Sequence, residues 1–197
     1  PAALKEKVLD FARDRSWSRY PPFIPMELRE RLAEYAGWRA DGVLVGNGSN
    51  EIIQALMTVF LGQGKRLVIP SPTFTVYRLL ATVLGAEVEQ VPLKPDYTYD
   101  CDALESAFLD RGDMVVICSP NNPTGAHAND DFYKKAISFA KTNDILICHD
   151  AAYSEIAYDG YQPKSILQFD RDKKHSVEFH SLSKTYCMTG WRIGFAV

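Results

Sequence analysis

The sequence predicts an α/β fold: a mostly parallel seven-stranded sheet with helices on both faces. Short apolar runs rich in β-branched residues alternate with segments of helical periodicity, which is typical of strands joined by crossover helices. Two of these helical segments stop at glycines, Gly62 and Gly85, as helices commonly do. With 197 residues, 46% of them hydrophobic, the chain is long enough to bury the core of one such domain.

Seven segments are expected to form strands, because each is short, apolar and bounded by turn residues. They are residues 43–45, 67–69, 87–91, 114–118, 145–148, 177–180 and 193–197. Helices are predicted at 50–61, 76–84, 102–109 and 131–141. The first should place Ile52, Ile53, Leu56, Val59 and Phe60 on one apolar face.

Two further helices, 5–14 and 26–36, precede the first strand, and the second opens after Pro25 and closes at Gly37. We expect them outside the sheet core, as an N-terminal helical segment over residues 1–37. Residues 38–197 then form the main domain. No internal repeat or long linker divides the chain further.

Composition favours small-molecule partners. The net charge is −3, and no run of basic residues interleaved with aromatics predicts a nucleic-acid or anionic-membrane surface. No stretch approaches the length of a membrane span, and the start of the chain has no signal-peptide pattern. The four cysteines, which lack C-x-x-C spacing, indicate reduced thiols and a cytoplasmic location; they are Cys101, Cys118, Cys148 and Cys187.

The four histidines do not have the spacing of a metal site, so no metal is predicted; they are His127, His149, His175 and His180. His149 and His180 flank the motifs described next, and we expect each to pack or cap.

Lys184 closes the run Ser181-Leu182-Ser183-Lys184 and is followed by Arg192. A lysine in this place is suited to hold an aldehyde cofactor as a Schiff base, while Ser181, Ser183 and Arg192 bind a phosphate. Further upstream, Gly46-Asn47-Gly48-Ser49-Asn50 follows the first strand and opens a helix. The helix start at Ser49 and Asn50 therefore offers N–H groups to a phosphate, or it is an ordinary tight turn with a capping residue. Glu51 stands where a dinucleotide fingerprint needs glycine, which disfavours a Rossmann cofactor.

Four more side chains follow predicted strands. Phe74 is placed either to stack on a cofactor ring or to join the core. Asn122, in Pro-Asn-Asn-Pro-Thr-Gly, is placed either to donate a hydrogen bond to a ring oxygen or to form an ordinary turn. Asp150, in His-Asp-Ala-Ala-Tyr-Ser-Glu, would keep a pyridine nitrogen protonated or cap a helix. Tyr153 would reach the same ring oxygen as Asn122 or be a structural tyrosine.

In their order along the chain, the motifs resemble those of the fold-type I, pyridoxal-phosphate-dependent aminotransferases of class I and II. The resemblance implies that Lys184 binds the cofactor and acts as base, and that Asp150 partners the pyridine nitrogen. It assigns the ring oxygen to Asn122 and Tyr153, and ring stacking to Phe74. It also implies that the cofactor phosphate is bound by Ser49, Asn50, Ser181, Ser183 and Arg192. Tyr20, in Ser-Arg-Tyr-Pro-Pro, matches a tyrosine that reaches the phosphate of a neighbouring subunit, which implies a homodimer.

Different parts of the chain resemble two different subfamilies. Residues 20–125 resemble histidinol-phosphate aminotransferase, and residues 126–197, with Glu-Phe-His-Ser-Leu-Ser-Lys-Thr-Tyr-Cys-Met-Thr-Gly-Trp-Arg, resemble LL-diaminopimelate aminotransferase. The chain is therefore expected to be a natural intermediate or a chimera, and, being about half the family's length, an isolated large domain without the small domain.

Three functions stay open at this point. The first is amino transfer between an amino acid and 2-oxoglutarate, in histidine or lysine biosynthesis. The second is a decarboxylase or other lyase that uses the same cofactor. The third is a catalytically inactive α/β domain that keeps the motif residues.

Overall fold

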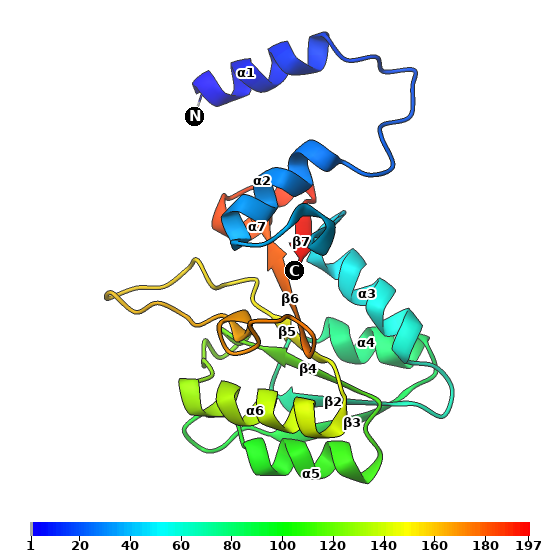
Figure 1. The fold of residues 1–197 in the computed structure, drawn as a ribbon, viewed down its shortest axis with the longest axis vertical. Helices are drawn as coiled ribbons and strands as arrows, with labels where there is room; N and C mark the ends of the chain where they lie inside the picture. Colours follow the sequence, from blue (N-terminus) through cyan, green and yellow to red (C-terminus); the bar gives the residue numbers. More distant parts are fainter. Residues whose placement is uncertain (1) are drawn as a thin grey trace.

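A computed structural model describes residues 2–197, and its centre is a seven-stranded sheet in the order β1-β7-β6-β5-β4-β2-β3 (Figure 1). The strands are β1 (Leu44–Gly46), β2 (Arg66–Ser71), β3 (Glu87–Pro92), β4 (Met114–Cys118), β5 (Ile147–Asp150), β6 (Ser176–Ser181) and β7 (Gly194–Ala196). Strands β2 to β6 pair in parallel, and only β7 runs antiparallel to its neighbours β6 and β1. The predicted α/β fold with a mostly parallel sheet is confirmed.

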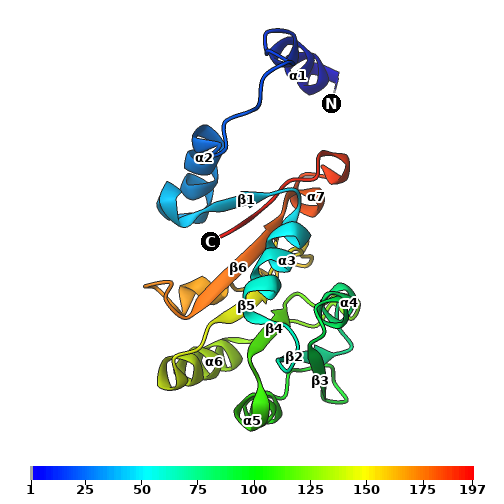
Figure 2. The same ribbon diagram turned by 90° about the vertical axis from the view of Figure 1, so that its right-hand side faces the viewer.

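Helices cover both faces of the sheet (Figure 2). The helices are α1 (Ala2–Arg13), α2 (Met26–Ala36), α3 (Ser49–Phe60), α4 (Val76–Val83), α5 (Cys101–Arg111), α6 (Asp130–Asn143) and α7 (Leu182–Thr185), with 3-10 turns η1 (Ala40–Gly42), η2 (Ile166–Gln168) and η3 (Thr189–Trp191). Helices α3 and α4 share one apolar core with the sheet, and α5 and α6 share another on the opposite face.

Helix α3 shows where the predicted apolar face was inaccurate. Ile52 and Ile53 are buried as expected, and Met57 joins them. Val59 and Phe60, which the helical period placed with them, are 76% and 43% exposed. The buried side of the helix runs from Ile53 through Met57 to Leu61, directly after the helix, which leaves Val59 and Phe60 beside this side rather than within it.

Strand β5 begins two residues later than predicted. Asp144 takes a left-handed conformation after α6, and the amide of Ile145 bonds back to Ala140 to close the helix. Residues 145 and 146 therefore belong to the helix exit. Strand β5 therefore ends at Asp150, the residue expected to contact the pyridine nitrogen of a cofactor.

The N-terminal helices differ in their packing. Helix α1 has no buried residue and lies apart from the sheet, joined by an extended segment (Figure 1). Helix α2 buries Leu32 and Ala33 in a third cluster with Val43 and Phe195. The proposed division at residue 37 stays a prediction; α2 itself is packed against the β1–β7 edge of the sheet.

Candidate active site

A polar pocket lies at the carboxyl ends of the parallel strands, where such folds place ligands. Residues that line it come from the start of α3, from the ends of β4, β5 and β6, and from the segments that follow β2, β4, β5 and β6: Ser49, Asn50, Phe74, Cys118, Asn122, Asp150, Ala152, Tyr153, Ser181, Lys184 and Arg192. Nine of the eleven predicted site residues are among them. Ser183 and Tyr20 are the two that are not.

Asp150 is one of the buried residues that line this pocket. Its side chain is only 4% exposed; the Tyr77 phenol donates to Oδ2, and the Ala152 amide donates to Oδ1 at 3.3 Å. Burial raises the pKa of Asp150, partly offset by the Tyr77 hydrogen bond and the positive charge of Lys184. An ionised carboxylate can accept about four hydrogen bonds, so these two neutral donors leave lone pairs for a further cationic or N–H donor.

Lys184 belongs to the short helix α7, directly after β6. Its Nζ lies 5.5 Å from the centre of the Tyr153 ring, and Asn122 Nδ2 donates to the Tyr153 hydroxyl at 3.3 Å. Burial raises the pKa of Tyr153, followed by the nearby Cys118 and Asp150, so its phenol stays a donor. The segments that follow β4, β5 and β6 thus bring an amide, a phenol and an amine together.

A second part of the pocket is suited to an anion. Helix α3 begins here, and the first N–H groups of a helix have no partner inside it. At Gly194 a Cβ would lie 2.2 Å from the Ser49 nitrogen, so glycine lets β7 approach the helix start closely. The Arg192 guanidinium lies beside Gly48, where a Cβ would be 2.9 Å from Nη2. A helix N-terminus and a guanidinium side by side favour a phosphate.

Phe74 lies between pocket and core. Its ring lines the pocket and meets the Tyr77 ring edge-on, with 5.5 Å between centroids. Ser183 is buried and lies outside the pocket lining. Tyr20 is 94% exposed, in the extended segment between α1 and α2, so this single chain does not bring it to the pocket.

The sequence motifs missed three residues of the site: Tyr77, Cys118 and Ala152. Tyr77 is fully buried near the start of α4, three residues after Phe74, and its place in the same Ser-Pro-Thr-Phe-Thr-Val-Tyr run is the signal that could have indicated it. Cys118 ends β4 in the pocket wall; burial, helped by Asp150, raises its pKa to about 12. The thiol is therefore protonated at neutral pH and is a poor nucleophile.

Within residues 2–197, no group of three or more His, Cys, Asp and Glu side chains is arranged to hold a metal ion. The same residues contain no helix with both the length and the apolar character to cross a bilayer.

Comparison with known proteins agrees with this geometry. The family model for class I and II aminotransferases matches residues 1–197. The chain belongs to this family. Aminotransferases of the family depend on pyridoxal phosphate, and the pocket described above lies where the motif residues of the resemblance converge.

Curated relatives include LL-diaminopimelate aminotransferase 2 of Nostoc sp., 39% identical over 209 residues, which cover 100% of this chain and 53% of the relative. The LL-diaminopimelate aminotransferase of Dehalococcoides mccartyi is also 39% identical, over 208 residues, with the same coverage. The chain thus spans about half the length of the curated relatives that it matches.

Solved structures of similar fold include BacF of Bacillus subtilis, with a TM-score of 0.90 and 30% identity over 100% of this chain and 52% of that one. N-succinyldiaminopimelate aminotransferase of Mycobacterium tuberculosis has a TM-score of 0.89 and 26% identity, covering 100% of this chain and 54% of its own.

Proposed function

We propose that this chain is the cofactor-binding part of a pyridoxal-phosphate-dependent aminotransferase that moves an amino group between an amino acid and 2-oxoglutarate. One observation carries the proposal: a buried carboxylate, Asp150, shares a pocket with Lys184 and with an anion cradle at Arg192. The donor set fits a ring that is cationic at one end, has a phosphate at the other, and carries an aldehyde between them.

The ring end of the fit depends on Asp150. Its carboxylate is desolvated and has neutral hydrogen-bond donors only, so a protonated pyridine nitrogen would offset the cost of burying its charge. Asn122 and Tyr153, already in mutual contact, would both face the ring oxygen. Phe74 would restrict the plane of the ring by stacking.

The phosphate end depends on backbone and charge. The N–H groups at Ser49 and Asn50, the Ser181 hydroxyl and the Arg192 guanidinium all line the pocket. Together they offer a helix dipole, hydrogen-bond donors and one full positive charge to a dianion. Ser183, buried next to Lys184, is proposed to reach the same group when it is bound.

Bound pyridoxal phosphate supplies an electron-accepting ring that stabilises negative charge on the α-carbon of an amino acid. Lys184 would hold the cofactor and, once its amine is free, move the α-proton as a general base. Asp150 would keep the ring nitrogen protonated. Phe74 and Tyr153 would fix the ring relative to the Lys184 amine.

For the amino donor we propose an amino acid of the diaminopimelate type, in lysine biosynthesis. Relatives named LL-diaminopimelate aminotransferase align with the whole chain, including residues 20–125. This coverage favours a single origin over a chimera. Because residues 20–125 also resemble histidinol-phosphate aminotransferase, histidinol phosphate is the second donor to test, with a role in histidine biosynthesis.

For the assembly we propose a cytoplasmic homodimer. Tyr20, almost fully exposed and not among the residues that line the pocket of its own chain, is free to complete the phosphate site of a neighbouring subunit. Supporting evidence for the location is that none of the four cysteines forms a disulfide.

The test is direct. Pyridoxal phosphate added to the purified protein should give a visible absorption band, and borohydride should fix the cofactor mass on the peptide that contains Lys184. Lys184→Ala should lose both signals, and the matched control Lys164→Ala, an exposed lysine, should keep both. The same band in wild type and Lys184→Ala would refute the proposal.

Assays with diaminopimelate, histidinol phosphate and 2-oxoglutarate then separate the functions. A new oxo acid supports the aminotransferase, and carbon dioxide release supports the lyase. The inactive-domain alternative is supported if the protein is folded but gives no cofactor band.

A further inference from the structure

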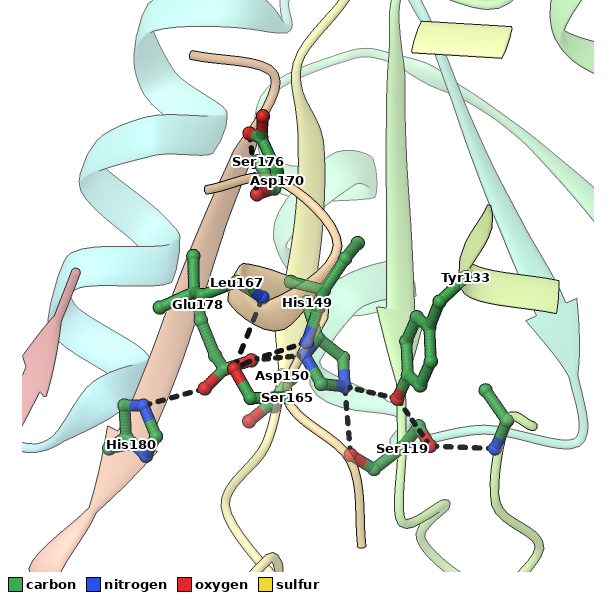
Figure 3. Close-up of polar contacts among 12 residues, drawn as sticks. Ser119, Tyr133, His149, Asp150, Ser165, Leu167, Asp170, Ser176, Glu178 and His180 are labelled. Carbon is green, nitrogen blue, oxygen red and sulfur yellow. Dashed lines mark hydrogen bonds and ion pairs between the residues drawn. The ribbon is translucent and has the colours of Figure 1, made fainter. Parts of the chain in front are cut away.

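A buried polar network lies on the face of the sheet opposite Asp150. His149 and Asp150 are neighbours on β5, so their side chains point to opposite faces. Asp150 meets Tyr77 of α4, whereas His149 meets Tyr133 of α6. In the sheet, His149 is in register with Glu178 of β6. The network, drawn in Figure 3, therefore lies outside the lining of the cofactor pocket, on the other face of the sheet.

Glu178 is the centre of this network and is only 2% exposed. Its Oε2 contacts His149 Nδ1 at 2.8 Å, accepts from Ser165 Oγ at 2.8 Å and from the Ile166 amide at 3.0 Å. Its Oε1 lies 3.0 Å from His180 Nε2. Burial alone would raise the pKa of Glu178, but the hydrogen bonds with His149 and His180 lower it far below the usual range. The side chain is therefore an anion with both oxygens occupied.

The surroundings of His149 determine where its protons lie. An ionised carboxylate only accepts, so Nδ1 must donate to Glu178. Nε2 lies 2.9 Å from the Ser119 carbonyl oxygen, which also only accepts. Tyr133, 3.1 Å from Nε2, donates to Ser119 Oγ and so has a lone pair free for the same N–H. These bonds are all satisfied when both ring nitrogens carry a proton.

The network joins the strand ends that carry the candidate site. Through Ser119 it reaches the end of β4, and Ser119 Oγ accepts from the Ala128 amide, which braces the loop that contains Asn122. His149 directly precedes Asp150. On β6, His180 stacks on Phe195 at 4.6 Å and 11°, four residues before Lys184.

We propose that Glu178 is a positioning residue for the cofactor site: it holds His149 protonated at both nitrogens, and the pair fixes the strand ends that carry Asn122, Asp150 and Lys184. The inference rests on the proposed function, because the site that is positioned is the one for pyridoxal phosphate. Buried charges that are fully hydrogen-bonded specify geometry, because a charge left without its partner is costly.

The first measurement needs neither a cofactor nor a variant. Nitrogen-15 NMR of histidine-labelled wild-type protein at neutral pH reports the protonation of each ring nitrogen, and His149→Asn assigns the signals. We expect both His149 nitrogens to carry protons. An unprotonated Nε2 or Nδ1 would overturn the proposal.

The second measurement uses variants that keep their shape. Glu178→Gln removes the charge, so His149 should lose one proton, and the dissociation constant for pyridoxal phosphate should rise at least about tenfold. The matched control is Asp170→Asn. Asp170 is also fully buried and accepts from the His175 amide at 2.8 Å and from Ser176 Oγ at 3.0 Å, at the other end of β6 (Figure 3). The affinity of the Asp170→Asn protein for pyridoxal phosphate should stay within about twofold of wild type.

Equal affinities in Glu178→Gln and Asp170→Asn, with both proteins folded by circular dichroism, would overturn the positioning role. If Glu178→Gln does not fold, Ser165→Ala takes its place, because it removes one contact to Glu178 and keeps the charge. A wild-type protein with no Lys184-dependent adduct refutes the proposed function, while the cofactor-free histidine spectrum still decides whether Glu178 holds His149 as described.

Discussion

The phenol of Tyr77 donates a hydrogen bond to the buried carboxylate of Asp150. This contact joins α4 to the end of β5, and Tyr77 also supports Phe74 edge-on. One tyrosine therefore orients both the carboxylate and the aromatic ring that are proposed to hold the cofactor ring.

Tyr77→Phe should weaken pyridoxal phosphate binding and lower stability. The carboxylate loses its strongest neutral donor while the shape of the core is kept, so the free energy of unfolding should fall by about 1–3 kcal/mol. Denaturant unfolding and cofactor titration measure the two effects. Tyr99→Phe is the control, because the Tyr99 phenol also makes one buried bond, to the Cys118 carbonyl oxygen. It should lose comparable stability but keep more of the affinity.

Asp150→Asn should stabilise the cofactor-free protein at neutral pH and impair cofactor binding. The pKa of Asp150 is raised in the fold, so its contribution to stability is fully present below the ordinary value of 3.8 and is lost as pH rises through the folded pKa. Asparagine carries no charge and avoids this loss. Unfolding free energies of the two proteins from pH 4 to pH 8 should diverge as pH rises; parallel curves would contradict the prediction.

Glu178→Gln should have the opposite pH dependence. The pKa of Glu178 is lowered in the fold, despite its burial, by His149 and His180. Its stabilising contribution is therefore present above the ordinary value of 4.5 and is lost as pH falls. Wild type should lose stability toward acid more steeply than Glu178→Gln. Thermal unfolding across pH 3–7 tests this, and a wild-type curve no steeper than that of the variant would count against it.

Gly194→Ala should disturb the phosphate end of the site. The added Cβ would lie 2.2 Å from the Ser49 nitrogen and 2.9 Å from the His180 carbonyl oxygen, both backbone atoms that cannot rotate away. We expect a loss of about 1–3 kcal/mol in stability, together with weaker binding of inorganic phosphate and of the cofactor. Gly190→Ala is the control, since no atom lies within 4 Å of its Cβ position. Calorimetry of both variants separates the close approach from a general effect of alanine.

Much of the candidate site was predictable because its residues follow strands in recognisable motifs. Asn122, Asp150 and Lys184 each stand in a motif at a strand end, and parallel strands bring such ends to one edge. The role of Ser183 in binding a phosphate stays a prediction. Ser183 belongs to the Ser-Leu-Ser-Lys motif, but in α7 its side chain is buried and does not line the pocket.

The order of residues along the chain was enough to predict the fold class, the family and nine of the side chains that line the pocket, because strand periodicity and local motifs depend on neighbouring residues. The hydrogen bond from Tyr77 to Asp150 and the contacts of Glu178 with His149 and His180 became evident only in the folded chain. Tyr77 and Asp150 are 73 positions apart, and Glu178 and His149 are 29 apart. Contacts at such separations depend on how helices and strands pack around the sheet, and no local pattern in the chain records that packing.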